Sequence, residues 1–187
     1  THLVLGFGIP PLQADDPVAA VAAAVLGEGM SSPLMDQLRE QRGLVYYAAC
    51  SADVVDRGGQ FVIEASTSPQ QLDECLGALA GLLAAQAAAI APIDLERGKN
   101  QLRVRRLRGL EKTGRRLEEA ALDLLLLGRL RSREDWLRRV DAASAEHVRS
   151  ALATMLQGGA ALAISGRVPR GSSDRARDIL VGHGLRL

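Results

Sequence analysis

The chain has 187 residues, the length of one domain, and can bury a core without needing a disulfide framework or a structural metal. Its formal net charge of +1 provides no overall field that would attract nucleic acid or an anionic membrane, and no run of 18 apolar residues predicts a membrane span. Alanine and leucine dominate the apolar 47% while aromatic residues make up 3%, which favours helices packed through small side chains.

A strand and two helices are predicted in the first 43 residues. The strand spans residues 2–8, and the first helix runs from about residue 16 to residue 26, where two glycines end it. Ser31 or Ser32 then caps the second helix, which has a proline in its first turn and continues to about residue 41.

A hairpin follows the break at Arg42-Gly43. Residues 44–55 and 59–67 have strand patterns, and Asp56-Arg57-Gly58 between them predicts an antiparallel turn. Ser68, a proline and Gln71 then form a helix-start pattern, and we expect this helix to reach about residue 90 before Pro92 ends it.

The rest of the chain is mostly helical. The helical pattern extends from residue 93 to residue 129, with a break near Gly109 or Gly114, and Ser132 and Ser144 open two more helices. A last strand is predicted at 160–168 and a last helix at 173–184. Four strands with helices grouped between them predict a single α+β domain over residues 1–187: a mainly antiparallel sheet covered on one face by a layer of helices, an α/β sandwich.

Metal and phosphate motifs are absent from the sequence. None of His2, His147 and His183 has a second histidine three or four residues away, so we predict no metal site in this chain. The "GEGMSS" stretch follows a helix and lacks the lysine of a phosphate-binding loop, which favours a helix-to-helix turn. Cys50 and Cys75 fit two core residues, although a single bridge between them stays open.

Residues 97–116 form a basic run, "RGKNQLRVRRLRGLEKTGRR". Leucines at helical spacing and interleaved glutamates indicate a solvated helix face. Without aromatic residues to stack bases, nucleic acid is the weaker interpretation, and we expect no nucleic-acid partner. A lining for a peptide chamber remains an alternative.

The stretch "LGEGMSSPLMDQLREQRGLVYY", residues 26–47, holds both tyrosines of the chain. Arg39 is expected in the last turn of a helix and Tyr46 near the start of the next strand, so both could face one region, while Tyr47 should face the other side of the sheet. A guanidinium and a phenol could together hold a peptide carbonyl or its oxyanion. The competing interpretation pairs Arg39 with Glu40 or Asp36 and packs Tyr46 in the core.

This stretch resembles the glycine–Met/Ser–helix–"LRE-(K/Q)-RGL-x-Y" block in the second domain of insulinase (pitrilysin) family zinc metallopeptidases. The segments "ERGKNQL", "GRRLEEAALDLLLLGR" and "WLRRVDAASAEHVRSALATML" extend the resemblance in order over nearly the whole chain. It differs from many relatives at Glu28, where they have a third glycine, and at Pro33, where they have an arginine.

The resemblance implies a role for the chain as the C-terminal, zinc-free domain of a longer two-domain bacterial subunit. In that family the first domain holds zinc through His-x-x-Glu-His, a motif that this chain lacks. The second domain supplies an arginine and a tyrosine seven residues apart, which map onto Arg39 and Tyr46. By this resemblance both would bind peptide inside a clamshell chamber, and Tyr46 would also act catalytically, in trans, by stabilising the oxyanion.

Several properties of the parent protein stay open at this level. The parent would be a homodimer or heterodimer that hydrolyses peptides with zinc bound by the other domain, and the 187-residue chain alone would be inactive. The alternative is a domain of an inactive family member that serves as a structural or peptide-binding subunit. A cytoplasmic and a periplasmic location are both compatible with the sequence.

Overall fold

The computed structural model describes residues 1–11, 14, 16–54 and 58–187. The strands are β1 (His2–Ile9), β2 (Val45–Val54), β3 (Gly59–Thr67) and β4 (Ala160–Ser165). The helical elements are α1 (Val18–Gly27), α2 (Pro33–Met35), the π-helical turn η2 (Asp36–Glu40), the 3-10 turn η3 (Pro69–Gln71), α3 (Leu72–Ala88), α4 (Pro92–Leu110), α5 (Thr113–Leu127), α6 (Arg133–Ala142), α7 (Ala145–Gln157) and α8 (Ser172–Gly182).

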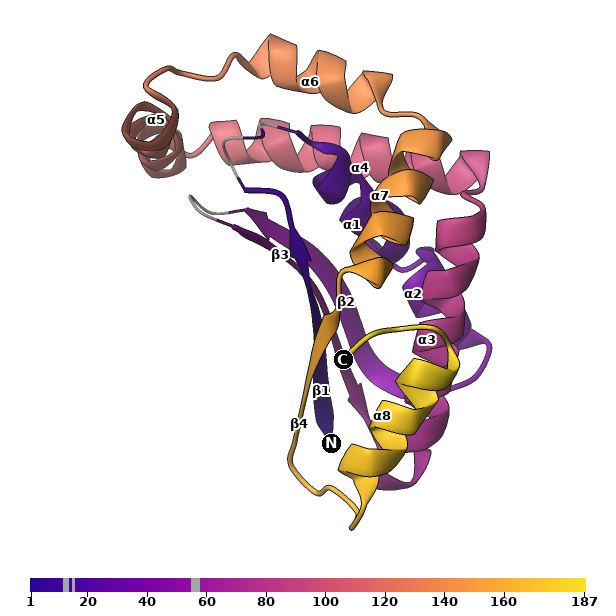
Figure 1. Cartoon of the computed structure of the whole chain (residues 1–187). Coiled ribbons are helices and arrows are strands. Elements are labelled where there is room, and N and C mark those ends of the chain that lie inside the picture. Colours follow the sequence, from indigo (N-terminus) through magenta and orange to yellow (C-terminus); the bar gives the residue numbers. More distant parts are fainter. Residues whose placement is uncertain (12–13, 15, 55–57) are drawn as a thin grey trace.

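The four strands form one antiparallel sheet in the order β2-β3-β1-β4. Helices lie along one face of the sheet, as Figure 1 shows. Alternate strand residues such as Leu5 and Ile63 are buried against these helices, whereas their neighbours Val4 and Glu64 are exposed. The predicted α+β class, with helices covering one face of an antiparallel sheet, is therefore confirmed.

Two glycines allow the helical layer to approach closely. A Cβ on Gly27 would lie 2.4 Å from the Cβ of Cys50, and a Cβ on Gly98 would lie 2.8 Å from the backbone nitrogen of Val25. Gly27 thus lets α1 pack on β2, and Gly98 lets α4 pack on α1. The expectation that the two glycines end the first helix is confirmed, because Gly27 is the last residue of α1 and Gly29 takes the left-handed conformation.

Two helix ends that lie next to prolines differ from the prediction. Pro92 occupies the first turn of α4 instead of terminating α3, which ends at Ala88. Ser68 donates to the Gln71 side chain at 2.8 Å and makes no cap hydrogen bond to the backbone. The predicted break in the long helical stretch falls between α4 and α5. The predicted hairpin turn at 56–58 lies largely outside the described residues.

The basic run was predicted to be a solvated face, and most of its basic side chains are exposed, but three of them join helices to one another. Arg97 donates to the carbonyls of Val25 and Glu28 at the end of α1, at 2.6 and 2.5 Å. Lys99 is buried and donates to the carbonyl of Asp141 at 3.0 Å. Arg106 pairs with Glu119 at 2.7 Å. These three charges therefore hold α4 against α1, α6 and α5.

No single helix among the described residues is long and apolar enough to cross a membrane. Residues Pro69–Ala88 and Pro92–Gly109 meet the length and composition criteria only as a pair bent by 98°.

Candidate functional site: a polar corner at one end of the sheet

The segment that carries Arg39 is a π-helical turn. The N–H of Gln41 donates to the carbonyl of Asp36, five residues back, at 2.9 Å. Gly43 then ends the helix with a φ of 60°, a left-handed conformation that glycine adopts without strain. π-helical turns occur frequently at functional sites, where the extra residue re-aims side chains. We define residues 36–47 as the corner.

A β-bulge follows directly at the start of β2. Val45 faces Thr67 on β3 and Tyr47 faces Ser66, so Tyr46 is an extra residue without a partner on β3. Bulges interrupt strict alternation of side chains and are common next to active sites. Tyr46 is 79% exposed and Tyr47 is 52% exposed. The expectation that Tyr46 and Tyr47 face opposite sides of the sheet assumed a regular strand, and the bulge interrupts that regularity at Tyr46.

Both predicted site residues are accessible at the corner. The Nε of Arg39 lies 3.7 Å from a carboxylate oxygen of Glu40, and the Arg39 side chain keeps 45% of its surface exposed. Exposed ion pairs of this kind contribute only about 0–1 kcal/mol, so Arg39 is weakly held. The phenol of Tyr46 has no hydrogen-bond partner among the described residues. The competing interpretation is thus correct for the Arg39–Glu40 pair and wrong in burying Tyr46.

Two hydrogen bonds of Leu44 hold the backbone of the corner in place. The Leu44 N–H donates to the Leu38 carbonyl at 2.8 Å, and the Leu44 carbonyl accepts the Thr67 hydroxyl at 2.6 Å. Thr67 is buried, with 3% of its surface exposed. Thr67 was not predicted as part of the site, although the sequence contains a signal for it. Thr67 continues the inward-facing series of Phe61, Ile63 and Ala65, and a hydroxyl at such a position needs a buried partner.

The two cysteines are free thiols in the structure. Cys75 lies in the core beside Thr67, and burial raises its pKa to about 11, an effect that the Thr67 hydroxyl partly opposes. Burial also raises the pKa of Cys50 above its ordinary value. Neither thiol therefore has the lowered pKa that marks a reactive cysteine.

The histidines take part in local hydrogen bonds. His147 and Ser144 form a reciprocal cap at the start of α7, with the Ser144 N–H donating to the His147 ring at 3.3 Å. The His2 ring lies 2.7 Å from the Ser66 hydroxyl, and the His183 ring lies 2.8 Å from the Ile179 carbonyl. Within residues 1–11, 14, 16–54 and 58–187, no three His, Cys, Asp or Glu side chains are grouped to hold a metal ion.

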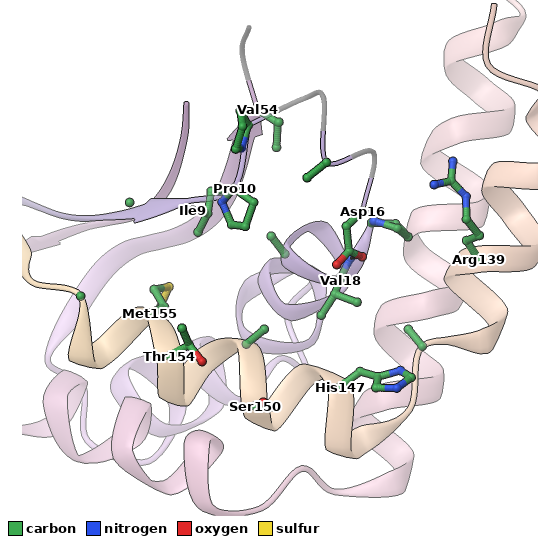
Figure 2. A pocket seen from close by; sticks show the side chains of 18 of the residues that line it. Ile9, Pro10, Asp16, Val18, Val54, Arg139, His147, Ser150, Thr154 and Met155 are labelled. Carbon is green, nitrogen blue, oxygen red and sulfur yellow. Dashed lines mark hydrogen bonds between the residues drawn. The ribbon is translucent and has the colours of Figure 1, made fainter. Parts of the chain in front are cut away.

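A cavity of about 860 Å³ lies at the opposite end of the sheet from the corner. Its walls come from the end of β1, including Ile9, from the start of α1, and from α7 (Figure 2). In Figure 2, Thr154 and Met155 face the segment around Pro10 across it. The cavity is mostly apolar, and neither Arg39 nor Tyr46 lines it. Sequence patterns gave no indication of it, because its walls meet only in the fold.

Solved structures identify the class of domain to which this fold corresponds. A crystal structure of a protease from Helicobacter pylori matches with a TM-score of 0.70 at 19% identity, over 86% of this chain and 39% of that one. A chain of complex III2 from Candida albicans, with Inz-5 bound, matches with a TM-score of 0.79 at 15% identity, over 96% of this chain and 46% of that one. At these identities the likeness establishes the α+β fold.

The family follows from the sequence itself. Residues 1–102, more than half of the chain and including the whole corner, match the family described as the Peptidase M16 inactive domain, and the chain belongs to this family. A protein of Mycobacterium tuberculosis named as an uncharacterized zinc protease is 28% identical over 174 residues, which cover 92% of this chain and 39% of the relative. One of Bacillus subtilis with a similar name, YmxG, is 27% identical over 78% of this chain and 36% of its own length.

The chain spans about two fifths of the length of these curated relatives. The resemblance seen in the sequence is therefore confirmed at the level of the family, in which this domain is described as inactive. The roles of Arg39 and Tyr46 remain predictions.

Proposed function

We propose that this domain supplies Arg39 and Tyr46 to the zinc site of another domain in a peptide-hydrolysing enzyme. The observation that carries the proposal is the exposure of Tyr46. One of only two tyrosines in the chain is 79% exposed on a β-bulge, six residues after the end of a π-helical turn that displays an arginine. A phenol and a guanidinium presented this way, with no buried partner, suit a ligand that comes from outside the domain.

Each side chain has a distinct chemical task in the proposed site. The guanidinium of Arg39 offers several N–H donors in a fixed fork, which can hold carbonyl oxygens of a bound peptide. The phenol of Tyr46 offers one O–H donor on a rigid ring. This donor can stabilise the negative charge that develops on the scissile carbonyl oxygen.

Zinc would be bound by the other domain, and the 187-residue chain would be inactive alone. The relatives named zinc proteases support this assignment, and the described residues group no metal ligands. When bound, zinc polarises the scissile carbonyl and activates water. The other domain would belong to the same or a partner subunit of a homodimer or heterodimer, and the two would enclose the peptide.

The test uses the parent enzyme with a peptide substrate. Tyr46→Phe should lower kcat by about 10²–10³, the usual loss for one oxyanion donor. Tyr47→Phe is the matched control, because it removes an exposed phenol one residue away, and it should leave kcat within about threefold. A Tyr46→Phe enzyme within a few-fold of wild type would refute the proposal.

Arg39→Ala tests peptide binding separately. It should raise KM more than it lowers kcat, because the guanidinium holds the backbone of the bound peptide in both ground and transition states. Arg42→Ala, three residues later in the same exposed segment, is the control and should leave KM unchanged. An unchanged KM in Arg39→Ala would remove arginine from the proposed site.

The alternative function is that of a structural or peptide-binding subunit in a parent without its own zinc. The two proposals differ in which chain must contain His-x-x-Glu-His. If the purified parent binds no zinc and gains activity only when a separate zinc-bearing subunit is added, the alternative is correct. Activity of the zinc-loaded parent alone supports the first proposal.

A further inference from the structure

We propose that Thr67 is a positioning residue that holds Tyr46 and Arg39 in their working arrangement. This inference rests on the proposed function and extends it to a residue that touches neither substrate nor metal. Its basis is the hydrogen bond from the buried Thr67 hydroxyl to the Leu44 carbonyl, at 2.6 Å, inside the corner.

Leu44 is the link between the two exposed side chains. Its N–H donates to the Leu38 carbonyl at 2.8 Å, which fixes it to the π-helical turn of Arg39. Its carbonyl accepts a hydrogen bond from the Thr67 hydroxyl, and Leu44 itself lies two residues before Tyr46. Leu44 therefore donates one hydrogen bond to the turn and accepts one from β3, and both must be present for Arg39 and Tyr46 to keep a fixed separation.

The Thr67 hydroxyl makes its hydrogen bond next to an irregularity in the pairing of β2 with β3. The Thr67 N–H donates to the Thr1 carbonyl at 2.9 Å, and the Thr67 carbonyl accepts from the Thr1 amino group at 3.0 Å, so its backbone is bonded on the β1 side. On the β2 side the register shifts between Val45 and Tyr47. The side chain of Thr67 supplies the connection to β2 next to this bulge.

A second contact to the same turn is weaker. The Gln71 side chain donates to the Gly43 carbonyl at 3.5 Å, at the limit of hydrogen-bond geometry and in an exposed position. The buried, short Thr67 bond should therefore dominate, because a buried carbonyl that loses its donor is not readily resolvated. We expect Gln71→Ala to change kcat by less than about twofold.

The experiment compares Thr67→Val with Thr67→Ser in the parent enzyme. Valine keeps the shape and removes the hydroxyl, and should lower kcat about tenfold because a catalytic group that moves by a fraction of an ångström loses much of its effect. Serine keeps the hydroxyl and should restore at least half of the lost kcat. Thr154→Val, at the far end of the sheet, is the chemical control and should leave kcat unchanged.

A double-mutant cycle separates positioning from general stability. If Thr67 acts through Tyr46, then Thr67→Val should lower kcat less than threefold in a Tyr46→Phe background, because the group it positions is already missing. Amide hydrogen exchange in the 187-residue chain gives a second readout. Residues 44–47 should exchange faster in Thr67→Val and return to wild-type rates in Thr67→Ser.

The outcomes are distinguishable. A neutral Tyr46→Phe would overturn the proposed function, and this inference with it. A damaging Tyr46→Phe combined with a full tenfold effect of Thr67→Val in both backgrounds would overturn only the positioning role. Equal losses of kcat in Thr67→Val and Thr67→Ser would do the same, because the hydroxyl would then be irrelevant.

Discussion

The corner and the segment at 113–131, which we call the α5 arm, differ in which kinds of side chain they bury and which they expose. In the corner, Leu38 and Leu44 are buried and the polar or aromatic side chains are exposed. In the α5 arm the leucines are exposed, with Leu125 at 79% and Leu117 at 72%, while Asp123 is buried. Figure 1 shows α5 standing away from the helices that cover the sheet.

The two regions are therefore held by different forces. Burial of apolar side chains anchors the corner, and hydrogen bonds within the corner set the shape of its backbone. The arm packs mainly against α4 and depends on polar contacts: Arg106 with Glu119 at 2.7 Å, and the Arg131 N–H and Nε with Asp123 at 2.9 and 2.8 Å. Segments with few buried apolar contacts open at a lower free energy than the core. The corner should thus unfold only with the whole domain, and the arm should open before it.

The largest expected effect comes from a pair of leucine substitutions. Leu38→Ala should lower the free energy of unfolding of the 187-residue chain by about 2–5 kcal/mol, because Leu38 is fully buried and its removal leaves a cavity. Leu125→Ala should change it by less than about 0.5 kcal/mol, since the side chain is already in water. Urea unfolding measures both. Similar losses in the two variants would show that the arm is part of the core.

Alkaline pH should weaken the buried region beneath the corner. The folded-state pKa of Cys75 is about 11 against an ordinary value of 9.0, so burial favours the neutral thiol. The stabilisation is complete below pH 9, decreases as pH rises through 9 to 11, and amounts to about 3 kcal/mol at most. Cys75→Ala should be less stable at pH 8 and should lose less stability than wild type between pH 8 and 10.5. Urea midpoints at both pH values give the comparison, and parallel losses would contradict it.

Much of the fold could be predicted from sequence because it depends on local patterns. The period-two alternation in β1 and β3 and the serine and proline signals before α2 and α7 each describe a few neighbouring residues. Gly27 shows the limit of such reasoning. Its position correctly indicated a helix end, but no local pattern indicated that it also admits the Cβ of Cys50 from a strand 23 residues away.

The candidate site likewise contains features that local sequence patterns can predict and features that they cannot. Residue type and position made Arg39 and Tyr46 candidates, the family resemblance selected them, and their exposure agrees with that selection. The π-helical turn and the β-bulge could not be predicted, because each adds one residue to a regular pattern without a distinctive sequence. The inter-helix contacts of the basic run could not be predicted either, because their partners, including Asp141 and the α1 carbonyls, are distant in sequence.

The smallest effect in the comparison concerns two glycines that end helices in the same conformation. Gly43 has a φ of 60° in the corner, Gly128 has a φ of 66° at the end of α5, and a Cβ on either would meet nothing within 4 Å. Alanine should therefore cost about 1–2 kcal/mol at both sites through backbone strain alone.

In Gly43→Ala this cost should lower the global stability measured by urea. In Gly128→Ala it should instead appear as faster amide exchange confined to the arm, because a segment that already opens separately relieves its strain without unfolding the domain. If Gly128→Ala lowers global stability as much as Gly43→Ala, the arm and the corner form one cooperative unit, and the difference in their anchoring has no energetic consequence.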